Sequence, residues 1–370
     1  MPIQERVTGH FPRLDGLRAL AVLAVAVYHW FHPTLWGRPL PLGEMGVSLF
    51  FVLSGYLIGG ILVDAQARNH AEGARPWFTL RAFAIRRALR IFPAYFVFLA
   101  LTAAILGLPD PEWYWYPLYL SNVHIETLSA WPEYWSHTWS LAVEEQFYLV
   151  IPLVVLFSGR RRLAGVLGLS VVVAGAAAAK LGTVGGWLGS DLGLIPPASF
   201  YGLLIGVVLA LAVRCLPHVF ELVAGLGVVA GIGWMAAWWW SFEGSHVLAI
   251  LGWPLLCAAV VLWATTDGVA GGFLELSPML WIGRLAYGIY LWHMPAPRLL
   301  EEIGVGAPDN DGAAFVLLAS CSVLAAKLSW DLVEKPINDV KSRYPYHPRS
   351  CDPAPGSIDA TVDTDPVRLS

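Results

Sequence analysis

Residues 13–30 read RLDGLRALAVLAVAVYHW, a segment that begins with charged residues, becomes continuously apolar and ends in a histidine. Arg18 and His29 are eleven positions apart. In a helix this is about three turns, so both would share a face, about 16 Å apart along the axis. Asp15 precedes Arg18 by one turn and can pair with it. Ionisable groups are costly inside a bilayer, so we expect these residues to have a function. The alternative is that Asp15 and Arg18 are interface anchors and that His29 lies at the outer interface.

The overall composition is typical of a polytopic membrane protein. Of 370 residues, 57% are hydrophobic and 14% charged, whereas soluble domains carry roughly 25% charged residues. The 18 tryptophans and 13 tyrosines fit residues that favour membrane interfaces. The net charge of −4 gives no reason to expect nucleic-acid binding. No metal-ligand spacing relates the four cysteines, so we expect no metal site.

Apolar runs predict an all-α fold of about ten transmembrane helices in one membrane-embedded domain over residues 1–340, followed by a disordered cytoplasmic tail at 341–370. Small residues in the second run predict close helix packing there. Basic clusters alternate with the runs so that both termini are predicted to be cytoplasmic. The predicted spans are residues 14–36, 43–62, 91–108, 139–157, 163–181, 197–213, 222–240, 246–266, 276–297 and 313–332.

Residues 139–148, WSLAVEEQFY, place two adjacent carboxylates at the start of the fourth predicted span. Glu144 and Tyr148 share a helix face, and Glu145 points about 100° away. Because this helix enters from the outside, we expect Glu144 at roughly the depth of His29, where it can orient the imidazole or contact an acceptor hydroxyl. The alternative is that both glutamates only complement the helix dipole.

Two further groups of residues can carry chemistry. Arg81, Arg86, Arg87 and Arg90 form a basic face before the third span. They can clamp an anionic donor such as the phosphates of coenzyme A, or they can simply set the topology. His293, at the end of GRLAYGIYLWH, repeats the arrangement of His29, with a structural or interface role as the alternative. Ser54 lacks the setting of a nucleophile elbow and is assigned to helix packing.

Five motifs taken in order resemble the acyltransferase-3 family of integral membrane acyltransferases. They are RLDGLRALAVLAVAVYH, FFVLSGYLIGGIL, RRALRIFPAYF, WSLAVEEQFYL and GRLAYGIYLWH, and Glu334-Lys335-Pro336 follows them. The resemblance covers about residues 13–336. It implies a multi-pass protein of the bacterial inner (plasma) membrane that moves an acetyl or other short acyl group from acyl-CoA to a hydroxyl. The implied acceptors are sugars, cell-envelope glycans and secondary metabolites of the macrolide type.

The resemblance also implies roles for particular residues. Arg18 and His29 match an Arg-x10-His motif in which the histidine is the catalytic base, and Glu144 is the carboxylate of a Trp-Ser-Leu-x-x-Glu pattern. The donor, expected to be acetyl-CoA, would be held by Arg18, Arg86, Arg87 and Arg90. No cofactor is expected to stay bound. Candidate substrate-binding residues are Asp15, Glu145, Tyr148 and His293.

Two other classes of protein are compatible with buried charges in a membrane. A transporter or flippase of an acyl donor or glycolipid would use them as a substrate or proton path, and it predicts flux without consumption of acyl-CoA. A non-catalytic sensor or structural protein would tolerate replacement of His29, Glu144 and Arg18. The sequence leaves open the acceptor, the acyl length, the side on which transfer finishes and the oligomeric state.

Overall fold

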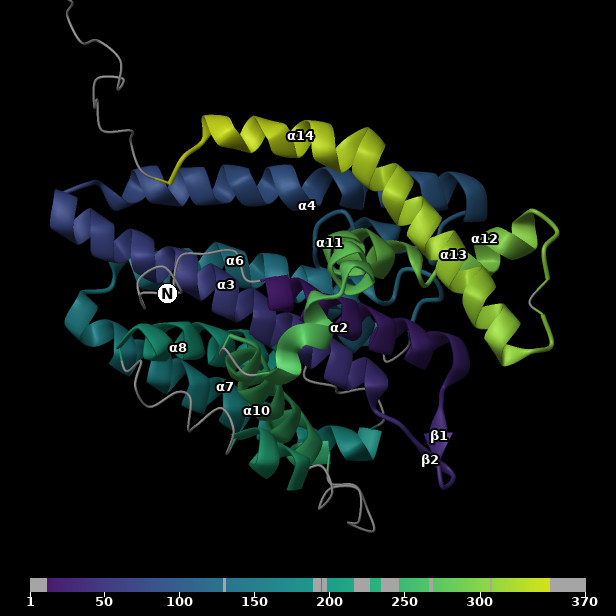
Figure 1. Ribbon diagram of the computed structural model, residues 1–370, viewed down its shortest axis with the longest axis horizontal. Coiled ribbons are helices and arrows are strands. Elements are labelled where there is room, and N and C mark those ends of the chain that lie inside the picture. Colours follow the sequence, from purple (N-terminus) through teal and green to yellow (C-terminus); the bar gives the residue numbers. More distant parts are fainter. Residues whose placement is uncertain are drawn as a thin grey trace, which may run out of the picture.

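The computed structural model describes residues 12–128, 131–188, 194, 198–215, 227–233, 246–265, 269–306 and 308–346. Within them the fold is all-α, as predicted, apart from one short hairpin of β1 (Thr34–Leu35) and β2 (Arg38–Pro39) (Figure 1). The longer helices are α2 (Pro12–Phe31), α3 (Leu42–Glu72), α4 (Pro76–Leu106), α6 (Thr138–Phe157), α7 (Arg160–Leu188), α8 (Tyr201–Cys215), α10 (His246–Ala264), α11 (Ser277–Trp292) and α13 (Asp311–Ser329).

Shorter helical elements connect and extend these helices. They are η1 (Trp113–Trp115), α5 (Ser121–Leu128), η2 (Ala198–Phe200), η4 (Val269–Glu275), α12 (Ala296–Glu302), η5 (Trp330–Glu334), α14 (Lys335–Asp339) and η6 (Val340–Arg343). The last three continue α13 without a break, so that α14 runs beside α4 (Figure 1).

Seven helical segments in the described part of the chain are long and apolar enough to cross a membrane. They coincide with predicted spans one to six and ten, which makes the protein a polytopic all-α membrane protein. α10 and α11 occupy the eighth and ninth predicted spans. The seventh predicted span is described only at residues 227–233, which are helical, and otherwise lies outside the described residues.

The second and third spans are longer than their apolar runs. α3 continues to Glu72, where Gly73 adopts a left-handed conformation with φ 66° and its N–H caps the helix at the carbonyl of Asn69. α4 then begins at Pro76, a residue suited to the first turn of a helix. The arginines at 86, 87 and 90 therefore lie within α4 rather than in a connecting segment.

Glycines allow the central helices to approach closely. A Cβ atom on Gly55 of α3 would overlap the carbonyl oxygen of Leu203 on α8, and one on Gly206 would overlap that of Val52. This confirms the predicted close packing of the second span. In the same way, Gly283 of α11 lies directly against the carbonyl oxygen of Asp15 on α2. Gly46 of α3 lies against the carbonyl oxygen of Ala21 on α2 as well, so α2 is fixed against both α3 and α11, which form walls of the site.

The segment between α4 and α6 is held against the bundle by buried tyrosines. The Tyr95 hydroxyl donates to the carbonyl of Tyr116 at 2.9 Å, and the Tyr116 hydroxyl donates to Asp110 at 2.8 Å. Burial, together with the hydrogen bond to Asp110, raises the pKa of Tyr116, so its hydroxyl stays protonated and keeps donating.

The C-terminal segment contributes to the same structure. Residues 341–346, which we predicted to be part of the tail, lie against α4, where Arg86 donates to the carbonyls of Lys341 and Tyr344. Residues 347–370 of the predicted tail lie outside the described residues.

Candidate active site

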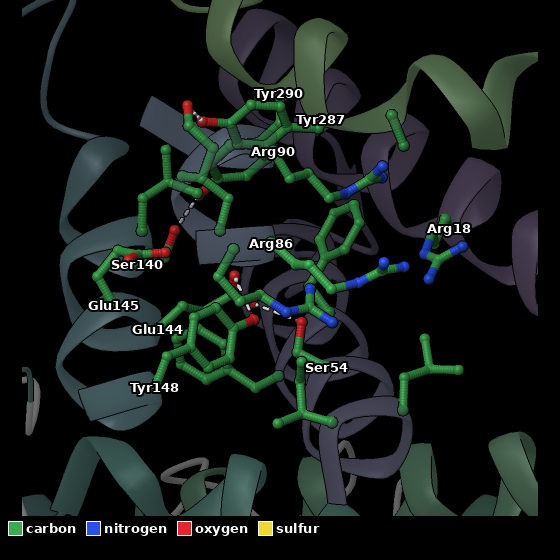
Figure 2. A pocket seen from close by; sticks show the side chains of 18 of the residues that line it. Arg18, Ser54, Arg86, Arg90, Ser140, Glu144, Glu145, Tyr148, Tyr287 and Tyr290 are labelled. Carbon is green, nitrogen blue, oxygen red and sulfur yellow. Dashed lines mark hydrogen bonds between the residues drawn. The ribbon is translucent and has the colours of Figure 1, made fainter. Parts of the chain in front are cut away.

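A cavity of about 680 Å³ lies between α2, α3, α4, α6, α11 and the C-terminal segment. In Figure 2 the guanidinium groups of Arg18, Arg86 and Arg90 lie on one side of the cavity, and the side chains of Glu144 and Glu145 of α6 lie on the other. The cavity is rich in charge. Six cationic side chains of the described residues line it: Arg18, Arg86, Arg87, Arg90, Arg284 and Lys341. Three carboxylates do so as well: Asp15, Glu144 and Glu145. With these groups ionised the lining is net positive, which favours an anionic ligand.

Packing fixes the arginines of α4. The guanidinium of Arg87 lies over the rings of Phe83 and Tyr148, 5.6 Å from each centroid. Arg86 donates hydrogen bonds to the backbone carbonyls of Lys341 and Tyr344 in the C-terminal segment. Its guanidinium carbon lies 4.8 Å from the ring centroid of Tyr346. Since a planar guanidinium that is already oriented loses less freedom on binding, these side chains are preorganised for a phosphate.

α2 brings a further charge pair to the cavity. Asp15 is 5% exposed and forms an ion pair with Arg18 one turn later, as the sequence predicted. The backbone of Asp15 lies against Gly283 of α11. The pair therefore holds Arg18 at the junction of two helices, with its guanidinium on the cavity wall.

The two glutamates of α6 differ in their surroundings. Glu144 accepts a hydrogen bond from Ser54 of α3 at 2.9 Å and another from Tyr148 one turn later at 3.2 Å. Glu145 has a buried carboxylate oxygen, Oε1, with no hydrogen-bond partner among the described residues. A buried carboxylate oxygen without a partner is costly, so Glu145 is available to a polar substrate group.

His29 is paired with His293. Nδ1 of His29 lies 3.1 Å from Nε2 of His293, and Nδ1 of His293 lies 2.7 Å from the carbonyl oxygen of Tyr290. Because a carbonyl only accepts, Nδ1 of His293 carries a proton, and neutral His293 therefore presents Nε2 as an acceptor. His29 then donates from Nδ1 and keeps a free lone pair on Nε2. This is the arrangement of a base oriented by a second group.

A thin wall separates this pair from the large cavity. His293 is fully buried, and its ring centroid is 5.4 Å from that of Tyr290. The Tyr290 hydroxyl is 2.6 Å from Ser140, and both residues line the large cavity. His29 lines a second cavity instead, of about 320 Å³, between the end of α2 and the helices α12 and α13. His29 thus lies on one side of a single aromatic layer, and the arginines lie on the other.

His137 adds a third imidazole, 5.2 Å from His293 between ring centroids. No group of three or more histidine, cysteine or acidic side chains in the described part of the chain is placed to hold a metal ion.

Comparison with known proteins connects this geometry to a family. A family model described as an acyltransferase domain matches residues 11–329. The chain belongs to the acyltransferase-3 family. Residues 11–329 include every site residue described so far except those of the C-terminal segment. No solved structure matches the chain.

The acyltransferase-3 chain is also similar to curated proteins that are named O-acetyltransferases. It is 29% identical to the putative peptidoglycan O-acetyltransferase YrhL of Bacillus subtilis and 29% identical to the peptidoglycan O-acetyltransferase OatA of Listeria monocytogenes. It is 26% identical to the O-acetyltransferase OatA of Staphylococcus aureus. Each match covers 89% of this chain, and the chain spans 55–57% of the length of these relatives.

The structure brings together most of the residues that we predicted in this acyltransferase-3 chain. The large cavity is lined by Asp15, Arg18, Arg86, Arg87, Arg90, Glu144, Glu145 and Tyr148. His29 and His293 lie behind its wall. Of the two roles expected for Glu144, contact with His29 is not formed, because Glu144 bonds Ser54 and Tyr148 while the partner of His29 is His293. Contact of Glu144 with a substrate stays a prediction.

Several residues of the site were not predicted from the sequence. Ser54 was assigned to helix packing, but its hydroxyl donates to Glu144. Ser140 and Tyr290 lie inside quoted motifs and were not singled out. Lys341 and Tyr346 line the cavity although we assigned them to a tail. The basic cluster at residues 335–343 was the available signal for Lys341, and we used it only for topology.

Proposed function

We propose that this protein is a membrane O-acyltransferase that moves an acetyl or other short acyl group from acyl-CoA to a hydroxyl of a cell-envelope glycan. The observation that carries the proposal is the position of His29. Only the layer formed by Tyr290 and His293 separates it from the net-positive, arginine-lined cavity, and its Nε2 is free to act as a base. Three similar curated proteins are named O-acetyltransferases, two of them for peptidoglycan, which supports acetyl as the group and a glycan as the acceptor.

Acyl-CoA is the donor in this proposal because its phosphates match the cationic lining. Arginine binds phosphate with two parallel hydrogen bonds, and Arg87 and Arg90 lie on the same wall as Lys341. At about 680 Å³ the cavity lies within the range of about 300–1,000 Å³ that is usual for small-molecule sites. The phosphates contact α4, and the thioester lies toward Ser140 and Tyr290.

His29 acts as the general base. Its Nε2 takes the proton of the acceptor hydroxyl while the oxygen attacks the thioester carbonyl. The new C–O bond forms as the C–S bond breaks, and the imidazolium returns the proton to the departing thiolate. Glu144 and Glu145 hold polar groups of the substrates, and Arg18, on the wall of the arginine-lined cavity, helps to hold the donor.

The arginine end of the molecule faces the cytoplasm in this proposal, and both termini are cytoplasmic. The reason is the density of cationic residues at that end, which the positive-inside rule assigns to the cytoplasmic side of the inner membrane. The donor is then taken from the cytoplasm, where acyl-CoA is made, and His29 lies toward the outer face.

The test uses protein purified in detergent, acetyl-CoA labelled in the acetyl group, and chitotetraose as a hydroxyl-bearing glycan probe. We expect label to appear on the glycan, and we expect His29→Ala and His29→Gln to abolish transfer while the protein still inserts and purifies. His32→Asn is the matched control, because His32 is exposed three residues further on and asparagine tolerates its φ of 45°.

Two results would contradict the proposal. If both His29 variants still transferred the acetyl group, His29 would not be the general base. Movement of a donor or glycolipid across proteoliposomes without consumption of acetyl-CoA would favour a transporter, which uses the same buried charges in another way.

A further inference from the structure

The cavity that His29 borders differs in chemistry from the arginine-lined cavity. Among the described residues, its lining contains two carboxylates, Glu301 and Asp311, and no lysine or arginine. The other lining residues are apolar or aromatic: Trp30, Phe31, Pro297, Leu300, Val305, Pro308, Ala314, Leu317 and Leu318. A polyanion such as acyl-CoA would be repelled by the carboxylates. An uncharged molecule that donates hydrogen bonds fits them, since an ionised carboxylate only accepts.

The size and rigidity of the cavity suit one small ligand group. Its volume of about 320 Å³ is at the lower end of the range of about 300–1,000 Å³ that is usual for ligand sites. The Trp30 indole donates to the carbonyl of His293 at 2.9 Å and packs edge-on against Phe315, which joins α2, α11 and α13 around the cavity. Arg298 forms an ion pair with Glu301, with 3.4 Å between the guanidinium nitrogen and the carboxylate oxygen.

The small cavity lies beside His29 and away from the arginines of the large cavity. In Figure 1, α12 and the N-terminal end of α13 lie at the end of the molecule toward which α2 runs. His29 is near the C-terminal end of α2, whereas Arg18 lies about three turns earlier, on the wall of the other cavity. A ligand in the small cavity can therefore reach His29 without displacing a donor bound at the arginines.

We propose that this small cavity is the acceptor site, which binds one uncharged, hydroxyl-bearing sugar unit of a glycan. The hydroxyl that reacts points at His29, and neighbouring hydroxyls donate to Glu301 and Asp311. Donor and acceptor then enter through separate cavities and meet at the layer formed by Tyr290 and His293. This inference rests on the proposed function and adds to it the place and the chemical class of the acceptor.

The test uses tryptophan substitutions on α13 that fill the small cavity. Ala314→Trp replaces a buried wall residue with a large ring, and Leu317→Trp does the same at a partly exposed position that disturbs packing less. Val316→Trp is the matched control, because Val316 is 63% exposed and lies outside the cavity lining. With acetyl-CoA as donor and chitotetraose as acceptor, KM is measured for each substrate, and hydrolysis of acetyl-CoA without acceptor is followed in parallel.

We expect both cavity variants to raise the KM for chitotetraose by about tenfold or more, a loss of about 1.4 kcal/mol, with the KM for acetyl-CoA unchanged. An unchanged donor KM also shows that the variants fold. If Ala314→Trp and Leu317→Trp had the same KM for chitotetraose as Val316→Trp, the proposed acceptor site would be wrong. The proposed function would still stand, because acetyl transfer would persist. If the wild-type protein transferred no acetyl group to the glycan, the proposed function would fail, and the acceptor site with it.

Discussion

Nδ1 of His29 lies 3.1 Å from Nε2 of His293, a residue that follows it by 264 positions in the sequence. The second imidazole is fully buried, and its other nitrogen is held by the carbonyl of Tyr290. The pair therefore has a defined direction: His293 accepts, and His29 donates from Nδ1. That direction leaves Nε2 of His29 facing away from the pair, and it makes His293 a positioning residue in the proposed reaction.

Removal of this partner is the first prediction. His293→Ala removes the side chain that accepts from Nδ1 of His29 and leaves the backbone of Val25 as a partner of the ring. The imidazole is then less firmly oriented, so kcat for acetyl transfer is expected to fall about 10- to 100-fold. KM for acetyl-CoA is expected to stay unchanged, because no arginine moves. Steady-state kinetics in detergent separate the two constants.

His293→Gln distinguishes orientation from a purely structural role. The side-chain oxygen of glutamine can accept from Nδ1 of His29 but cannot carry a proton, so we expect kcat to recover to within about tenfold of wild type. If the glutamine variant is as slow as the alanine variant, orientation by a hydrogen bond is not what His293 supplies.

The second prediction concerns Arg87, whose guanidinium is stacked on Phe83 and Tyr148. Arg87→Ala is expected to raise the KM for acetyl-CoA about 10- to 100-fold, because a hydrogen bond to a charged group is worth about 1.5–3 kcal/mol. Arg87→Lys keeps the charge but loses the planar fork and should recover only part of this.

Arg81→Ala is the control for that series, since Arg81 is exposed on the same helix and does not line the cavity. The dependence of donor KM on salt should also weaken in Arg87→Ala, because one charge no longer contributes. Equal donor KM values for the Arg81 and Arg87 variants would place the donor phosphates elsewhere.

Ser54 supplies the third prediction, which separates direct transfer from an acyl-enzyme. Its hydroxyl donates to Glu144 at 2.9 Å. In direct transfer, Ser54→Ala removes only this hydrogen bond, and kcat should fall about tenfold or less. Ser48→Ala, on the same helix and outside the cavity lining, is the control. Complete loss of transfer in Ser54→Ala, together with a labelled acetyl group on Ser54 of the wild-type protein, would establish the acyl-enzyme route instead.

The parts of the structure that the sequence predicted follow from local rules. Apolar length set the spans, and helical spacing alone predicted the Asp15–Arg18 ion pair and the shared face of Glu144 and Tyr148, which are hydrogen-bonded. Both pairs are separated by one helical turn, so their geometry does not depend on how the helices pack.

Contacts between distant helices could not be predicted in this way. The depth of a residue in the membrane does not determine which neighbouring helix it faces, so Glu144 was expected near His29 although α11 supplies the partner of His29. Composition also misassigned residues 341–346. The polar, proline-containing sequence that follows them resembles a tail, but the carbonyls of Lys341 and Tyr344 accept hydrogen bonds from Arg86, which is more than 250 residues away in the sequence.

The fourth prediction tests the junction that positions both Arg18 and His29. Gly283 of α11 lies against the carbonyl oxygen of Asp15, so the methyl group of Gly283→Ala would overlap the backbone of α2. Overpacking of this kind costs about 1–3 kcal/mol, and we expect a lower thermal unfolding midpoint in detergent. Gly165→Ala is the control, because no atom of the described residues lies within 4 Å of its added methyl group in α7, and alanine favours a helix over glycine by about 0.5–1 kcal/mol. Transfer should also fall in the Gly283 variant, since α2 carries the base and a donor arginine together. A Gly283 variant as stable and active as the Gly165 variant would mean that this contact does not hold α2 in place.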